Sequence, residues 1–265
     1  MTSLSPVTAD VFSAAGVPSA VGASKMLVPY VTAGVTPGWT DLLRASVDAG
    51  ADAIELGLPF SDPTMDGPVV QQASYQALCR GATVTGILDE VSRLELGVPL
   101  IAFAYTNLVV HRGPDTFCEA LREAGLTGLI APDLPIDEAG PVREAAARHE
   151  IDMILLASPS TPPQRRAQIA RQSQAFVYAV SVMAPTGEQT SLRSSGRDLV
   201  LALKSETDLP VLLGFGISGP AQAATACEHA DGVVVGSALM RRVLDGATPT
   251  EIGTLLSTMR TAIDT

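Results

Sequence analysis

Short runs of aliphatic residues recur along the chain, and a longer helix-like stretch separates each run from the next. Strands that are apolar throughout are buried on both faces, and intervening helices imply parallel pairing. The predicted strands are Met26–Thr32, Ala53–Gly57, Pro99–Tyr105, Gly128–Ala131, Asp152–Ala157, Ala175–Ser181, Pro210–Gly214 and Gly232–Gly236. The predicted helices include Thr40–Asp48, Val69–Arg80, Ile87–Glu95, Phe117–Glu123, Ala139–His149, Pro163–Gln172, Asp198–Thr207 and Pro220–His229.

Eight repeated strand–helix units in 265 residues favour an α/β protein, a (β/α)8 TIM barrel forming a single domain. A weak internal sequence repeat supports this fold. A helix end, a small-residue turn and a strand follow one another in each of Asp48–Ile54, Glu123–Leu129 and Glu228–Val234. The alternative is an open doubly wound sheet, but Thr32–Gly38 is not the glycine-rich turn that usually follows its first strand. Residues 1–25 are predicted to be a partly flexible N-terminal extension.

Composition narrows the class of function. Hydrophobic residues make up 46% of the chain and aromatics only 4%, so the core is expected to be large and aliphatic. A net charge of −11 argues against nucleic-acid binding, although backbone N–H groups can still bind a phosphorylated small molecule. We see neither a membrane span nor a secretory signal, so a cytoplasmic enzyme is the default.

Cysteines and histidines do not point to a metal site. The three cysteines, Cys79, Cys118 and Cys227, are far apart, and we interpret them as half-buried small hydrophobes in a reducing compartment. The three histidines fall in a loop and at helix ends rather than at strand ends. We therefore predict no metal.

Two carboxylates are the main candidates for chemistry. Glu55 lies among apolar residues in the second predicted strand, where partial desolvation would raise its pKa and suit it to general acid–base work. Asp66 follows eleven residues later, in the Pro- and Gly-rich loop 59–68. On spacing alone, Asp66 is as consistent with a turn or a helix cap as with catalysis.

Other strand ends remain open to more than one interpretation. Tyr105 could contact a substrate or only pack, and Asp133 could contact a ligand or cap the next helix. Three late loops carry glycine, around Gly187, Gly214–Ser218 and Gly236–Ala238. Because barrels often bind phosphate after strands seven and eight, these loops predict a phosphate site.

The residues from Glu55 to Pro68 resemble the motif of the tryptophan synthase α subunit family: a strand Glu, then Gly-x-Pro-Phe-Ser-Asp-Pro, and Asp-Gly-Pro after two further residues. Further similarity lies in Tyr105–Leu108, Pro132–Pro135, Thr186–Gly187, Gly214–Ser218 and Gly236–Ala238. The resemblance extends from about Leu27 onward. It implies a cofactor-free retro-aldol cleavage of indole-3-glycerol phosphate to indole and glyceraldehyde 3-phosphate.

The resemblance also implies roles for individual residues. Glu55 would be the general acid/base at indole C3 and the glycerol hydroxyl, and Asp66 would bind the indole N–H. The implied substrate contacts are Tyr30, Phe103, Tyr105, Thr186 and Phe215, and the implied phosphate contacts are Gly187, Gly216, Gly236 and Ser237.

The resemblance further implies a pyridoxal-phosphate-dependent β subunit as partner, in an α2β2 heterotetramer. The loop 181–187 departs from the common pattern, with Val182 and Pro185 where polar residues and Val are frequent. This departure motivates an alternative, a stand-alone lyase that releases free indole or a related indole. A catalytically idle barrel that only activates a β subunit is a third hypothesis, which the presence of both Glu55 and Asp66 disfavours.

Overall fold

The computed structural model describes residues 24–180, 189–214 and 216–265, and within these ranges nine strands form one parallel sheet. The strands are β1 (Met26–Thr32), β2 (Ile54–Gly57), β3 (Leu100–Phe103), β4 (Gly128–Ile130), β5 (Asp152–Met153), β6 (Leu156–Ala157), β7 (Val177–Val180), β8 (Val211–Gly214) and β9 (Gly232–Val235). Each falls inside a predicted strand. The N-terminal extension, up to residue 23, lies outside the described residues.

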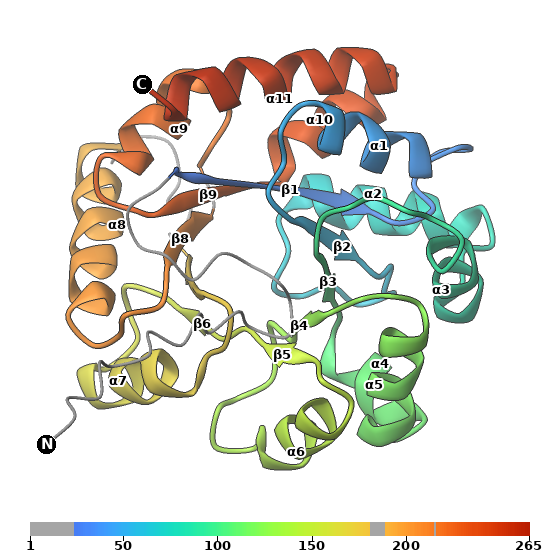
Figure 1. Cartoon of the computed structure of the whole chain (residues 1–265), viewed down its shortest axis with the longest axis horizontal. Helices are drawn as coiled ribbons and strands as arrows, with labels where there is room; N and C mark the ends of the chain where they lie inside the picture. The colour runs from blue at the N-terminus through green and yellow to red at the C-terminus, as the bar shows by residue number, and fades with distance from the viewer. Residues whose placement is uncertain (1–23, 181–188, 215) are drawn as a thin grey trace, which may run out of the picture.

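The predicted strand Asp152–Ala157 closes the sheet into a barrel, although it is divided into β5 and β6. The strand order is β5-β4-β3-β2-β1-β9-β8-β7-β6, so these two short strands stand at opposite ends of the sheet. The intervening residues bond to both neighbours: the Ile154 N–H donates to Leu129 O at 3.0 Å, and the Tyr178 N–H donates to Leu155 O at 3.0 Å. The predicted (β/α)8 barrel is therefore confirmed (Figure 1).

Helices surround the strands on the outside of the barrel (Figure 1). They are α1 (Thr40–Asp48), α2 (Pro68–Cys79), α3 (Val84–Val91), α4 (Thr106–His111), α5 (Pro114–Glu123), α6 (Gly140–Arg148), α7 (Pro163–Gln172), α8 (Gln189–Lys204), α9 (Pro220–Cys227), α10 (Ser237–Leu244) and α11 (Pro249–Ile263). The eight predicted helices correspond to eight of these, and most bounds differ by a few residues. The N-terminus of α8 begins nine residues earlier than predicted.

Of the helices that the prediction omitted, α11 had the clearest signal. Thr248 and Glu251 form a capping box at its N-terminus. Its buried residues recur at helical spacing, at Ile252, Leu255, Leu256, Met259 and Ile263. The helix packs across α1 and α9 and covers the region where the first and last barrel strands meet (Figure 1).

Two aspartates have the same structural role in two of the three segments of the internal sequence repeat. Asp52 and Asp231 each stand just before a strand, and each accepts a backbone N–H from the start of the neighbouring strand, Leu27 at 2.7 Å and Val211 at 3.0 Å. Arg260 pairs with Asp52 at 2.8 Å, and Lys204 pairs with Asp231 at 2.6 Å. The repeated turn thus ties adjacent strands together at the N-terminal end of the barrel, away from the candidate site.

The cysteines are not half-buried as predicted, because Cys118 and Cys227 are buried and Cys79 is exposed on α2. Across the described ranges, none of the helices has the length and apolar character needed to cross a membrane.

Candidate active site

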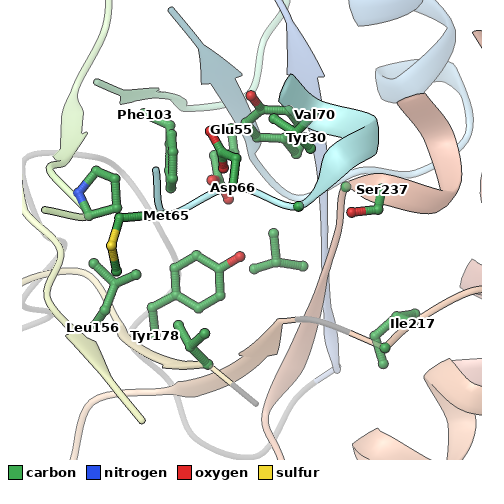
Figure 2. Close-up of a pocket in the computed structure, with 16 residues that line it drawn as sticks. Tyr30, Glu55, Met65, Asp66, Val70, Phe103, Leu156, Tyr178, Ile217 and Ser237 are labelled. Atoms are coloured by element: carbon green, nitrogen blue, oxygen red, sulfur yellow. The ribbon is translucent and has the colours of Figure 1, made fainter. Parts of the chain in front are cut away.

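A pocket opens at the C-terminal ends of the strands, where barrel enzymes carry their active sites (Figure 2). Seven predicted site residues line it: Tyr30, Glu55, Asp66, Phe103, Gly216, Gly236 and Ser237. Three others, Thr186, Gly187 and Phe215, lie outside the described residues. The pocket therefore brings together most of the predicted site residues, although Tyr30 and Ser237 stand about two hundred positions apart in the sequence.

Glu55 projects into the pocket from β2. In the register of the sheet it lies beside Tyr30 of β1 and Ile101 of β3, and it is only 2% exposed. Its Oε2 has no hydrogen-bond partner among the described residues. Burial, and secondly the nearby charge of Asp66, raises the pKa of Glu55 from 4.5 to about 8. Glu55 is thus a neutral acid at pH 7, poised to donate a proton.

Asp66 reaches the same pocket from the loop between β2 and α2, and Figure 2 shows it next to Glu55. The Tyr105 hydroxyl donates a hydrogen bond to Asp66 Oδ2 at 3.0 Å. Burial raises the pKa of Asp66 to about 6, and the Tyr105 bond opposes that rise. At neutral pH the two carboxyls therefore differ in charge, with Asp66 the anion and Glu55 the acid.

Aromatic rings form one wall of the site. Tyr30 and Phe103, which line the pocket, meet edge to face with centroids 5.8 Å apart. Next to this wall, Phe60 stacks on Tyr105 at 5.2 Å. Tyr105 is not among the residues that line the pocket, but its hydroxyl contacts Asp66, which does line it. Such a wall suits a flat, apolar ring.

Tyr178 was not predicted as a site residue, yet it lines the pocket from β7 (Figure 2). It is buried, and its pKa is raised well above the usual value by burial and then by the charge of Glu55. Its position in an apolar strand gave no polar signal, but strand alternation places it on the same face as Val180, which also lines the pocket. Leu156, Val234, Ile217 and Val70 were missed for the same reason, since they are ordinary apolar residues.

Two glycines make room for the tyrosine rings. A Cβ added at Gly57 would lie 2.1 Å from the Tyr30 hydroxyl oxygen, and one at Gly214 would lie 2.2 Å from Tyr178 Cε2. Atoms cannot approach so closely, so each glycine lets a ring from the neighbouring strand cross the barrel interior.

Gly57→Ala is therefore expected to destabilise the fold by about 1–3 kcal/mol, since the buried Tyr30 ring must move. Urea unfolding measures this change. Gly140→Ala is the matched control, because a Cβ there meets nothing within 4 Å. If the clash is the cause, Gly57→Ala has little further effect in a Tyr30→Ala background; full additivity would contradict it.

The opposite side of the pocket carries the predicted phosphate-binding residues. Gly236 is the N-cap of α10, Ser237 is its first residue, and Ser237 lies across the pocket from Phe103 (Figure 2). The positive end of a helix dipole and first-turn N–H groups favour an anion there. Gly216 adopts a left-handed φ of +80°, which gives its backbone access to the pocket at low steric cost.

Asp133 does not cap the helix that follows it, which was one of its two predicted alternatives. Its carboxylate accepts hydrogen bonds from the Thr106 backbone and hydroxyl, both at 2.8 Å, and so caps α4. The capped helix, α4, lies earlier in the chain, and α5 and β4 separate it from Asp133. Among the described residues, no three His, Cys, Asp or Glu side chains gather as a metal site would require.

A closed parallel barrel with an acid and a carboxylate at its C-terminal mouth, facing a helix N-terminus, defines an α/β-barrel enzyme of acid–base chemistry on an anionic substrate. Residues 20–259 match the protein family described as tryptophan synthase alpha chain. The chain belongs to this family.

Individual relatives agree with this assignment. The alpha chain of Picosynechococcus sp. is 45% identical over 230 residues, which cover 85% of this chain and 87% of the relative. A crystal structure of tryptophan synthase from M. tuberculosis, in an aminoacrylate-bound form, superposes with a TM-score of 0.82 at 34% identity, covering 91% of this chain and 94% of the other. The alpha subunit from Legionella pneumophila gives 0.82 at 36% identity, with coverage of 91% and 93%.

Proposed function

We propose that this chain cleaves indole-3-glycerol phosphate to indole and glyceraldehyde 3-phosphate, as the α subunit of a tryptophan synthase. The observation that carries the proposal is the pairing of a neutral acid, Glu55, with a neighbouring anion, Asp66, in one pocket. When one carboxyl is protonated and its neighbour is ionised, the same site supplies both an acid and an anion.

In the proposed complex, the indole ring lies against Tyr30 and Phe103, and the phosphate lies at the N-terminus of α10. The Asp66 carboxylate accepts the indole N–H, and the Glu55 carboxyl faces indole C3. This orientation places the acid at the carbon that must be protonated and the anion at the nitrogen that becomes positive. The residues Thr186, Gly187 and Phe215 retain their predicted roles as substrate and phosphate contacts.

In the proposed reaction, Glu55 donates one proton and later accepts another. Protonation of indole C3 by Glu55 produces an indolenine cation, which Asp66 stabilises electrostatically. Glu55 then accepts the proton of the glycerol hydroxyl adjacent to the scissile bond. The C–C bond breaks, the new aldehyde leaves as glyceraldehyde 3-phosphate, and the electron pair returns to the ring as indole. Glu55 ends protonated, as it began, and no redox step is involved.

We further propose that the chain works in the cytoplasm with a pyridoxal-phosphate-dependent β subunit in an α2β2 complex, because its relatives are alpha chains of tryptophan synthase. Steady-state indole release by the purified chain, with and without a β subunit, tests both parts. Strong activation by the partner supports the proposal, and high turnover by the isolated chain alone supports a stand-alone lyase instead. Absence of turnover in both conditions refutes the lyase.

The pH dependence of kcat/KM is expected to be bell-shaped, with its maximum near pH 7. Activity falls below a pKa of about 6, where Asp66 loses its charge, and above about 8, where Glu55 loses its proton. Because the two carboxyls interact, the apparent pKa values of the two limbs describe the pair and not either residue alone. Initial rates between pH 5 and 9.5 measure them, and a rate that keeps rising through pH 8 would contradict the role of Glu55 as an acid.

A further inference from the structure

Asp133 lies on the exposed loop after β4, yet its contacts lead towards the carboxylate pair in the pocket. Its Oδ1 accepts hydrogen bonds from the Thr106 N–H and hydroxyl at 2.8 Å each. Thr106 is the first residue of α4, and Tyr105, the N-cap, makes no side-chain capping bond. Asp133 thus supplies, from a different loop, the acceptor that an N-cap side chain usually provides.

Tyr105 continues the connection to the pocket. Its hydroxyl accepts a hydrogen bond from the Met65 N–H and donates one to Asp66 Oδ2, both at 3.0 Å. Phe60 and Phe103 hold the ring in place, at centroid distances of 5.2 Å and 6.3 Å. The orientation of the buried ring therefore depends on the backbone at residues 105 and 106, which Asp133 restrains.

We propose that Asp133 is a positioning residue for Asp66, which acts by fixing the Tyr105–Thr106 backbone so that Tyr105 can hold the loop that carries Asp66. Its kinetic consequence rests on the proposed lyase function. The hydrogen bonds that connect Asp133 to Asp66 through Thr106 and Tyr105 can be tested without measuring turnover.

The direction of the Asp66 titration distinguishes positioning from simple electrostatics. Besides Tyr105, the titratable groups that face Asp66 are Glu55 of β2, Tyr30 of β1 and Tyr178 of β7. All three remain unchanged in an Asp133 variant. Loss of the Asp133 charge by itself would lower the pKa of Asp66, whereas a weakened bond from Tyr105 raises it.

The experiment measures the Asp66 carboxyl titration by carbon-13 NMR, with the resonance assigned through Asp66→Asn. Asp133→Ala is expected to raise the pKa of Asp66 by about half a pH unit. It is also expected to lower kcat about tenfold with little change in KM, because a displaced Asp66 meets the transition state poorly. Asp133→Asn keeps an acceptor oxygen for Thr106 and should retain nearly normal values. Glu138→Ala, which removes an exposed acid from the same loop, is the control.

A Tyr105→Phe background supplies the decisive comparison, because it removes the hydroxyl through which Asp133 is proposed to act. There, Asp133→Ala should shift neither the titration nor kcat further. The proposal is overturned if Asp133→Ala leaves the Asp66 pKa unmoved or lowers it, or if the shift persists without the Tyr105 hydroxyl. Should Asp133→Ala fail to fold, Thr106→Val must give a smaller shift in the same direction, and its absence also overturns the proposal. A wild-type chain without turnover would refute the lyase alone.

Discussion

Glu55→Gln is expected to lose turnover by a factor of about 10³ while affinity for indole-3-glycerol phosphate stays within about twofold. The amide has nearly the same shape as the carboxyl, but it cannot donate a proton to indole C3 or accept one from the glycerol hydroxyl. Single-turnover rates measure the loss of turnover, and equilibrium binding measures the affinity, because the variant consumes the substrate too slowly to disturb the binding measurement. A variant with near-normal turnover would remove Glu55 from the mechanism.

The same substitution should not harm the fold, and this makes the kinetic result interpretable. The pKa of Glu55 is raised in the folded chain from 4.5 to about 8, so the folded state holds a proton that the unfolded state has released. The contribution of Glu55 to the free energy of unfolding therefore falls as pH rises from about 4.5 through 8, and it is lowest above 8. Glutamine does not titrate, so Glu55→Gln is expected to melt at a temperature equal to or above that of the wild type at pH 8.5. A lower melting temperature at that pH would indicate that the amide itself disrupts the pocket.

The strands of the barrel were predictable because their determinants are local. A buried parallel strand needs an unbroken aliphatic run, and each of the eight runs appears in the sheet. The division of Asp152–Ala157 into β5 and β6 was not predictable, because it reflects how one strand bonds to β4 with its first half and to β7 with its second. Barrel closure is a property of the whole sheet, and no single segment encodes it.

The site was only partly predictable, for a related reason. Glu55 was identifiable because a carboxyl in an apolar strand is rare without a role. Asp66 was ambiguous until the family motif was considered, and only the fold shows Tyr105 holding it beside Glu55. Tyr178 carried no signal at all, because a tyrosine in a buried strand is usually a packing residue.

Asp133 illustrates a different limit. Its loop position allowed both a cap on the next helix and a ligand contact, and the sequence offers no way to see that it caps α4, two helices earlier in the chain. The bond to Thr106 joins loops after β3 and β4, which only the parallel sheet brings together. Contacts between barrel loops therefore cannot be predicted without the three-dimensional structure, even when every helix and strand involved is predicted correctly.

Asp66→Asn is expected to lower kcat by about 10²- to 10³-fold, because the neutral amide cannot stabilise the positive charge that develops on the indole ring. The amide oxygen can still accept the Tyr105 hydroxyl, so the loop should keep its position. Asp62→Asn is the matched control, since Asp62 lies four residues earlier in the same loop, is exposed and does not line the pocket. An equal loss in both variants would show that the effect comes from the loop rather than from the charge at the ring.

The basic limb of the pH profile gives an independent check on Asp66→Asn. The Asp66 charge is the second cause of the raised pKa of Glu55, so its removal should lower that pKa below about 8. Burial, the larger cause, remains, and the pKa should therefore stay above the ordinary 4.5. The residual activity of Asp66→Asn should lose its acid limb and show a basic limb at lower pH than the wild type. A basic limb that does not move would mean that the two carboxyls are not electrostatically coupled. The raised pKa of Glu55 would then be caused by burial alone.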